Sequence, residues 1–221
     1  MKTIIVNCKN YPEVLGEGTL RMALAVARVA AAVKVNAIVA PPAPMLAQVA
    51  SKSKAKVFSQ GVASAAGDRT TGAVLPEAVK AAGAVGTILN HSESRVPAAE
   101  LTKLVPRLAA LGLEVCLCAR TSKEAAKLSK LSPAYIAVEP PELIGSGVAV
   151  SRARPELIER TVAALREAGY GGEVLCGAGI VSGDDVRKAV ELGSDGVLVA
   201  SSVVKAPDWE IKIRELAGSL L

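Results

Sequence analysis

Four polar residues of this 221-residue chain stand at or just beyond the ends of short apolar runs, and their types could combine in acid–base chemistry. Asn7 ends the run "TIIVN", and Lys9 lies two positions further on. His91, the only histidine, follows "VGTILN", and Glu139 follows "AYIAV". A carboxylate can accept a proton, a neutral imidazole can donate one to oxygen, and an ammonium can offset negative charge. Together these groups suit proton abstraction from a carbon atom beside a carbonyl.

The residues around Glu139 predict a fixed carboxylate beneath a movable segment. Glu139 precedes a proline, which holds it in extended geometry, so it should continue the direction of the apolar run before it. Pro140 and Pro141 stiffen the chain beyond this residue, and Gly145 and Gly147 can absorb a change in backbone angles. We therefore expect a segment after Glu139 that can swing at Gly145 and Gly147.

Two turns of small residues could bind a phosphate group. "GAGI" (Gly177–Ile180) and "ASS" (Ala200–Ser202) follow the last two apolar runs. Backbone N–H groups at such strand-to-helix turns bind phosphate, and Gly145 and Ser146 could add further donors. Tight packing also demands small residues, so neither turn is specific by itself.

Each candidate also has a structural interpretation when it is taken alone. His91 could be a hydrogen-bonded imidazole at a helix start, and Glu139 a solvated loop acid. Lys9 could be a surface lysine, and Glu93 an acid at a helix N-terminus, which is common. The positions of these residues after apolar runs favour a shared site.

The elements that must position these residues alternate between strand and helix. Eight apolar runs are predicted as strands: Thr3–Asn7, Asn36–Ala40, Lys56–Gln60, Val85–Asn90, Glu114–Cys118, Ala134–Val138, Glu173–Gly177 and Gly196–Ala200. Helices are predicted at Leu20–Val33, Ala98–Gly112 (with a kink or a late start at Pro106), Ser122–Leu131, Arg154–Gly169, Ser182–Gly193 and Asp208–Leu220. Continuous apolar runs are typical of parallel strands that are buried on both faces.

This alternation predicts an α/β protein, a (β/α)8 barrel that occupies residues 1–221 as a single domain. In such barrels the loops after the strands meet at one mouth, which would bring the four candidates together. A doubly wound open sheet is the rival fold. No glycine-rich nucleotide motif follows the first run, which weakens that alternative.

Composition excludes several classes of function. The net charge of +5 is modest, and the basic residues have no aromatic platforms among them, so we expect no nucleic-acid partner. The four cysteines lie in apolar runs without zinc spacing, as buried thiols do in a reducing compartment. Neither a secretory signal nor a spanning segment of about 18 apolar residues is evident. We therefore expect a cytoplasmic protein with no membrane partner.

The motifs resemble those of the triosephosphate isomerase family, along the whole chain and in the same order. They are "NCK", "NHSESR", "VEPPELIGSG", "CGAGI" and "GVLVAS". "NHSESR" and "VEPPELIGSG" are specific together, whereas the glycine turns are not. The short chain and the "EPPELIG" motif resemble the archaeal-type subgroup. The resemblance implies the TIM-barrel fold and the interconversion of glyceraldehyde 3-phosphate and dihydroxyacetone phosphate.

The resemblance also implies a role for each matching residue. Glu139 matches the base, His91 the electrophile, Lys9 the substrate-binding cation, Asn7 a hydrogen-bonding partner and Glu93 an acid beside the lysine. The positions implied in substrate binding are Asn7, Lys9, Ile144, Gly145, Gly177, Gly179, Ala200 and Ser201. No cofactor and no metal ion is implied.

Some residues depart from the family pattern. Ala200–Ser201 stands where many members carry a Gly-Gly pair, and Gly179 where many carry serine. The resemblance implies that Pro140–Gly147 forms a lid over the site, and this lid lacks a tryptophan that is common in longer members. These changes put phosphate affinity and lid rates in doubt, but not the reaction.

The resemblance further implies a homo-oligomer, with a tetramer favoured over a dimer, in which a loop at about 61–75 docks on a neighbouring subunit. A free-standing loop is the alternative. Two other functions stay open: a different phosphate-binding barrel, such as a sugar-phosphate epimerase or a tryptophan-pathway isomerase, and a barrel that binds a phosphorylated metabolite without catalysis.

Overall fold

Eight parallel strands close into a barrel in chain order, each hydrogen-bonded to the next and β8 to β1. The computed structural model describes residues 1–140 and 153–221. The strands are β1 (Thr3–Asn7), β2 (Asn36–Ala40), β3 (Lys56–Ser59), β4 (Gly86–Leu89), β5 (Glu114–Ala119), β6 (Tyr135–Val138), β7 (Glu173–Cys176) and β8 (Gly196–Val199). The predicted (β/α)8 barrel is confirmed, and the open-sheet alternative is wrong because the sheet has no edge strand.

The interior and the exterior of the barrel form two separate apolar clusters. Ile5 of β1 pairs with Ile38 of β2 and Leu198 of β8, and all three belong to the interior cluster. Their neighbours on β1, Ile4 and Val6, pack with the helices in the outer cluster. Because side chains of a strand alternate between faces, both faces are buried and the strands appear as continuous apolar runs.

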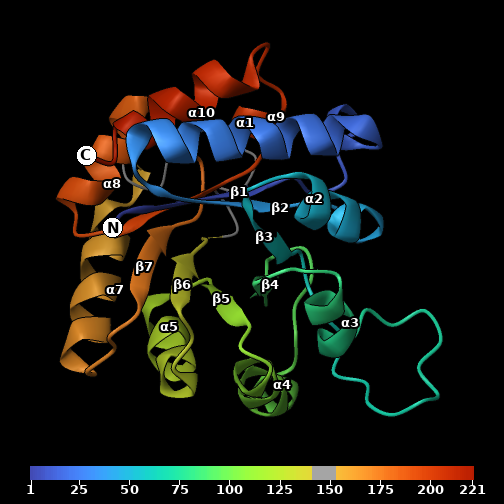
Figure 1. Ribbon diagram of the computed structural model, residues 1–221. Helices are drawn as coiled ribbons and strands as arrows, with labels where there is room; N and C mark the ends of the chain where they lie inside the picture. Colours follow the sequence, from blue (N-terminus) through green and yellow to red (C-terminus); the bar gives the residue numbers. More distant parts are fainter. Residues whose placement is uncertain (141–152) are drawn as a thin grey trace.

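Helices surround the sheet on its outer face (Figure 1). The α-helices are α1 (Glu17–Val33), α2 (Leu46–Lys52), α3 (Pro76–Ala81), α4 (Ala98–Ala110), α5 (Ser122–Leu128), α7 (Pro155–Glu167), α8 (Gly183–Glu191), α9 (Ser201–Val204) and α10 (Trp209–Gly218). The described residues also form the 3₁₀ turns η1 (Pro12–Val14), η2 (Ala43–Met45) and η3 (Ser129–Leu131). The cap of α8 is a reciprocal box between Ser182 and Asp185, which accounts for the predicted start there.

The structure differs from the predicted helices at several points. The short helices α2, α3 and α9 were not predicted, since four to seven residues give too little periodicity to read. The helix α4 begins at Ala98 and contains Pro106, so the late start is wrong. Its stop is as predicted, because Gly112 takes a φ of +66° just after the helix.

The segment between β3 and α3 extends away from the barrel (Figure 1). Its two arms are joined by the Ala63 N–H, which donates to the Val74 carbonyl at 2.8 Å. Its base is tied to α4 by Arg107, which donates to the Ala65 carbonyl at 2.8 Å. The predicted loop at about 61–75 therefore projects from the body.

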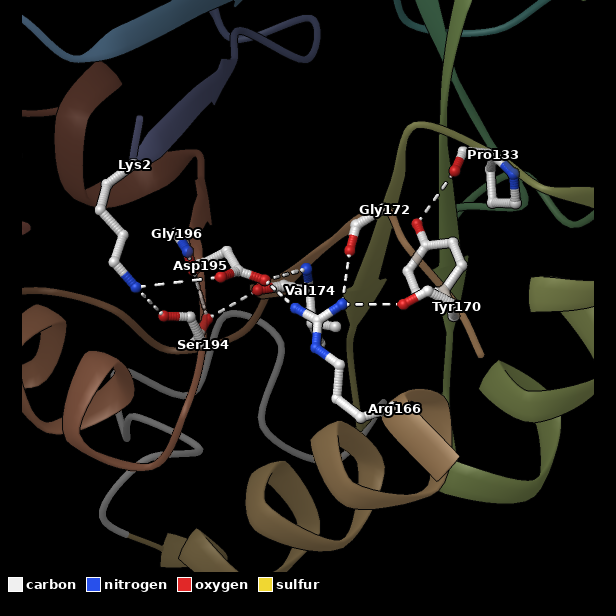
Figure 2. Close-up of polar contacts among 9 residues, drawn as sticks. All are labelled: Lys2, Pro133, Arg166, Tyr170, Gly172, Val174, Ser194, Asp195 and Gly196. Atoms are coloured by element: carbon white, nitrogen blue, oxygen red, sulfur yellow. Dashed lines mark hydrogen bonds and ion pairs between the residues drawn. The ribbon is translucent and has the colours of Figure 1, made fainter. Parts of the chain in front are cut away.

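A polar network closes the floor of the barrel beside β7 and β8 (Figure 2). Arg166 of α7 donates to the carbonyls of Tyr170 and Gly172, each at 2.9 Å, and to Asp195 at 2.6 Å. Asp195 also accepts a bond from the backbone N–H of Val174 at 3.0 Å. The network ties α7 to the start of two strands, at the end of the barrel opposite the mouth.

Candidate active site

The carboxyl ends of β1, β4 and β6 bring four predicted residues to one cavity at the mouth of the barrel. Asn7 is the last residue of β1, and Glu139 follows β6 directly. Asn7, Lys9, His91 and Glu139 all line this cavity. Although 132 positions of sequence separate Asn7 from Glu139, the closed sheet places their strand ends around the same opening.

Glu139 and His91 face each other across the floor of the cavity. The Nε2 atom of His91 lies 3.5 Å from Oε1 of Glu139. Only 2% of Glu139 is exposed, and its backbone N–H donates to the carbonyl of Ala119 at 2.7 Å. That bond extends the β5–β6 ladder by one residue, so the carboxylate is carried by the rigid end of the sheet.

Burial raises the pKa of Glu139 from its ordinary value of 4.5 to about 7. Removal from water disfavours the charged form. Hydrogen bonds from the Cys118 thiol and the Ser92 backbone, together with the charge of Lys9, oppose this effect without cancelling it. A carboxylate with a pKa near neutrality is a stronger base than an ordinary one and is still ionised in part at pH 7.

His91 is arranged as a neutral imidazole. Its Nδ1 accepts a hydrogen bond from the backbone N–H of Glu93 at 3.2 Å, so the hydrogen-bond pattern assigns the ring proton to Nε2. Burial and the nearby cation of Lys9 lower the pKa of His91, while Glu93 acts against them. The Nε2–H is thus available as a donor on the cavity side of the ring.

Lys9 is held by three contacts in a backbone conformation that is rare for lysine, with a φ of +46°. Its ammonium pairs with the Glu93 carboxylate at 2.7 Å, and its backbone N–H donates to Oδ1 of Asn7 at 3.0 Å. The carbonyl of Lys9 accepts a bond from Gln60 at 2.9 Å, and the same Gln60 amide also bonds the Ala40 carbonyl. Strain of this kind persists only where the surroundings enforce it.

Four further predicted positions line the same cavity. Gly177, Gly179, Ala200 and Ser201 all line it, and Gly179 takes a φ of +72°. The helix α9 begins at Ser201, so the first backbone N–H groups of this helix belong to Ser201 and Ser202, which line the cavity. The predicted residues Ile144, Gly145, Ser146 and Gly147 lie outside the described part of the chain.

The structure adds residues that the sequence did not single out. Tyr11 lines the cavity, and Gln60 donates to the Lys9 carbonyl. Gln60 directly follows β3, so the rule that polar residues at strand ends mark the mouth could have found it. Tyr11 lies in an irregular turn and carries no such signal.

Metal-binding clusters and membrane-spanning helices are not found in the described residues. In residues 1–140 and 153–221, no group of three or more His, Cys, Asp or Glu side chains is arranged to hold a metal ion. No helix in the same ranges is both long and apolar enough to cross a bilayer.

Comparison with known proteins gives the same family throughout. The family model for triosephosphate isomerase matches residues 2–216. The triosephosphate isomerase of Cenarchaeum symbiosum (strain A) is 48% identical over 217 residues, which covers 98% of this chain and 97% of the relative. The enzyme of that name from Caldivirga maquilingensis is 43% identical over 99% of this chain and 97% of its own length. The triosephosphate isomerase of Methanocaldococcus jannaschii is 41% identical, over 96% of this chain and 97% of its own length.

Proposed function

The chain belongs to the triosephosphate isomerase family, and we propose that it interconverts D-glyceraldehyde 3-phosphate and dihydroxyacetone phosphate, as the names of its relatives indicate. The observation that carries the proposal is the 3.5 Å approach of His91 and Glu139 in a buried cavity that also contains Lys9. A base, a neutral donor and a cation around one small cavity are the groups that this reaction requires.

Glu139 acts as the base. Its carboxylate removes a proton from the carbon beside the carbonyl, and the electron pair of the broken C–H bond forms the C=C bond of an enediolate. The negative charge then lies on the former carbonyl oxygen. Return of the proton to the neighbouring carbon completes the isomerisation, so one carboxylate serves both steps. The raised pKa of Glu139 suits this exchange near neutral pH.

His91 acts as the electrophile. Its Nε2–H, which faces Glu139, can donate to the substrate oxygens on which charge develops. Donors that are already oriented toward such charge stabilise it without reorganisation. Because the ring is neutral, it can also give its Nε2 proton to the former carbonyl oxygen and take the hydroxyl proton of the neighbouring oxygen in return, which restores the imidazole.

Lys9 holds the substrate and offsets its negative charge, with Asn7 and Glu93 in support. The Glu93 carboxylate fixes the ammonium at 2.7 Å, and Asn7 supports the turn that carries it. A cation fixed in advance loses little side-chain freedom when an anion binds. Glu93 is therefore assigned a positioning role.

The phosphate group binds at the wall formed by Gly177, Gly179, Ala200 and Ser201. Backbone N–H groups supply the contacts, so the replacement of glycine by Ala200 and Ser201 is compatible with binding. Contacts from Ile144 and Gly145 are also proposed, from the resemblance alone. No metal or organic cofactor takes part in the proposed mechanism.

A coupled assay tests the proposal. Glyceraldehyde 3-phosphate is supplied, and the dihydroxyacetone phosphate formed is reduced with NADH by an auxiliary dehydrogenase. We expect rapid turnover with no added metal ion. If no product forms while 2-phosphoglycolate still binds, the protein is a binding barrel without catalysis and the proposal is wrong.

We also propose a cytoplasmic location, a role in glycolysis and gluconeogenesis, and a homo-oligomer, with a tetramer favoured over a dimer. Four buried free cysteines support a reducing compartment. The projecting segment after β3 supports subunit contacts, since it offers a surface beyond the barrel itself. Sedimentation equilibrium tests the assembly, because a tetramer has four times the 22.5 kDa of one chain; a monomer would contradict it.

A further inference from the structure

A groove lies outside the catalytic cavity, between the start of α4 and the helix α5. It has a volume of about 650 Å³, which is within the range of small-molecule sites. The charged residues among its described lining are Arg95, Arg120, Lys123, Glu124, Lys127 and Arg154. It shares none of these residues with the cavity of His91 and Glu139.

Positive charge dominates this groove. Three arginines and two lysines line it, whereas Glu124 is the one acidic residue among the described residues of the lining. The chain as a whole carries only +5, so a large share of its excess charge is gathered here. A concave surface lined by charge of one sign concentrates ions of the opposite sign.

The single carboxylate is already shared between two arginines. Glu124 pairs with Arg95, and its second oxygen lies 3.7 Å from Nε of Arg120 and accepts the Arg120 backbone N–H at 2.8 Å. Burial acts to raise the pKa of Glu124, but these contacts outweigh it and hold the pKa below its ordinary value. Glu124 therefore stays ionised. Its two oxygens already contact Arg95 and Arg120, so they do not neutralise Lys123 or Lys127.

Lys123 and Lys127 have no acidic partner among the residues that the structure describes. Both side chains are exposed, and in the described part of the chain neither ammonium pairs with a carboxylate. They are four positions apart on α5, so they lie on the same face of the helix. Like charges at this spacing destabilise a helix, and an anion bound between them would remove that repulsion.

We propose that this groove binds a small polyanion that carries two or more phosphate groups. Arg120, whose side chain is 52% exposed, offers a planar fork for phosphate oxygens, and the exposed Lys123 and Lys127 offer point charges. Arg95 adds its positive charge, while its guanidinium is held by the Asn90 carbonyl and Glu124. No aromatic side chain is found among the described lining residues, so the groove has no platform for a nucleic-acid base. The recognised chemistry is thus the phosphate groups themselves.

Isothermal titration with inorganic tripolyphosphate tests this site. The catalytic cavity is first saturated with 2-phosphoglycolate, and the ionic strength is kept fixed. We expect saturable binding of one tripolyphosphate per chain. The double variant Lys123→Gln/Lys127→Gln should weaken it about tenfold or more, because two charge-assisted contacts are lost.

The matched control is Lys52→Gln/Lys54→Gln, which removes the same charge from exposed lysines at the end of α2 and in the loop after it, neither of which lines the groove. We expect affinity within about twofold of the unaltered protein, as for distant surface charges screened by salt. Equal weakening by both double variants would mean diffuse attraction to surface charge and would overturn the proposal. Failure to bind tripolyphosphate at all would also overturn it.

Discussion

Gly177 lies so close to Glu139 that a Cβ atom at position 177 would be 2.6 Å from Cγ of Glu139. The same Cβ would be 3.1 Å from the carbonyl oxygen of Val138, which accepts the backbone N–H of Gly177 at 3.0 Å. The strand ladder keeps the backbone of both strands in place, so only the carboxylate side chain can yield. A glycine directly after β7 thus fixes where the carboxylate after β6 lies.

Replacement of Gly177 by alanine should therefore damage catalysis more than stability. The added methyl group displaces the carboxylate of Glu139, and a displacement of about 1 Å can lower turnover by about 100-fold. Steady-state kinetics measure the effect. The control is Gly171→Ala, because a Cβ there meets nothing within 4 Å. Equal turnover in the two variants would show that Gly177 does not position the base.

Much of this site could be predicted from the sequence because the order of the strands along the chain determines where their ends lie in the barrel. Asn7, His91 and Glu139 each end or follow an apolar run, and parallel strands in a closed barrel put all such ends at one mouth. The close packing of Gly177 on Glu139 could not be predicted, since it depends on how two neighbouring strands are registered. The positive φ of Lys9 and its support by Gln60 are likewise tertiary effects, invisible in local sequence.

The short helices could not be predicted from local sequence patterns either. The helix α2 has seven residues, and no side chain caps its N-terminus, so neither periodicity nor a capping residue marks it. By contrast α8 has a Ser182 cap and acids in its first turn, and it was predicted with bounds close to those observed. Packing against the barrel, rather than intrinsic propensity, holds the shortest helices in place.

The raised pKa of Glu139 should make the protein less stable as pH rises. Between 4.5, the ordinary value, and about 7, the folded state binds this proton more tightly than the unfolded state does. Stability therefore falls with rising pH across that window, by up to about 3 kcal/mol in total. In Glu139→Gln this loss of stability is absent. Urea unfolding should therefore show the free energy of unfolding of the variant rising, relative to that of the unaltered protein, from pH 4.5 to about 7. A difference that stays constant from about pH 4 to about pH 8 would contradict the assigned shift.

Lys9→Met should weaken the binding of 2-phosphoglycolate by about 10- to 100-fold, the expected loss for one charge-assisted contact in a partly buried site. Calorimetry measures it. The control is Lys34→Met, because Lys34 also has a positive φ, +59°, and lies exposed after α1, away from the cavity. The two variants share the cost of methionine in a left-handed backbone. Equal affinities of the two variants for 2-phosphoglycolate would show that the Lys9 ammonium does not contribute to binding.

Arg166→Met should lower the free energy of unfolding by about 1–2 kcal/mol and leave turnover unchanged. The variant loses three hydrogen bonds at the end of the barrel opposite the mouth, but the Arg166 side chain is 42% exposed, so water and salt reduce their contribution. Urea denaturation and steady-state kinetics are compared on the same preparation. A fall in turnover with unaltered stability would contradict this prediction, because it would mean that contacts at the far end of the barrel affect catalysis at the mouth.

The turnover of Glu139→Gln tests the central claim most directly, since the amide keeps the shape of the side chain and cannot accept the proton. The account predicts a loss of at least about 1,000-fold in kcat, within the range expected when an acid–base group is removed, while 2-phosphoglycolate still binds. Turnover within about tenfold of the unaltered protein, measured under the same conditions, would contradict the assignment of Glu139 as the base.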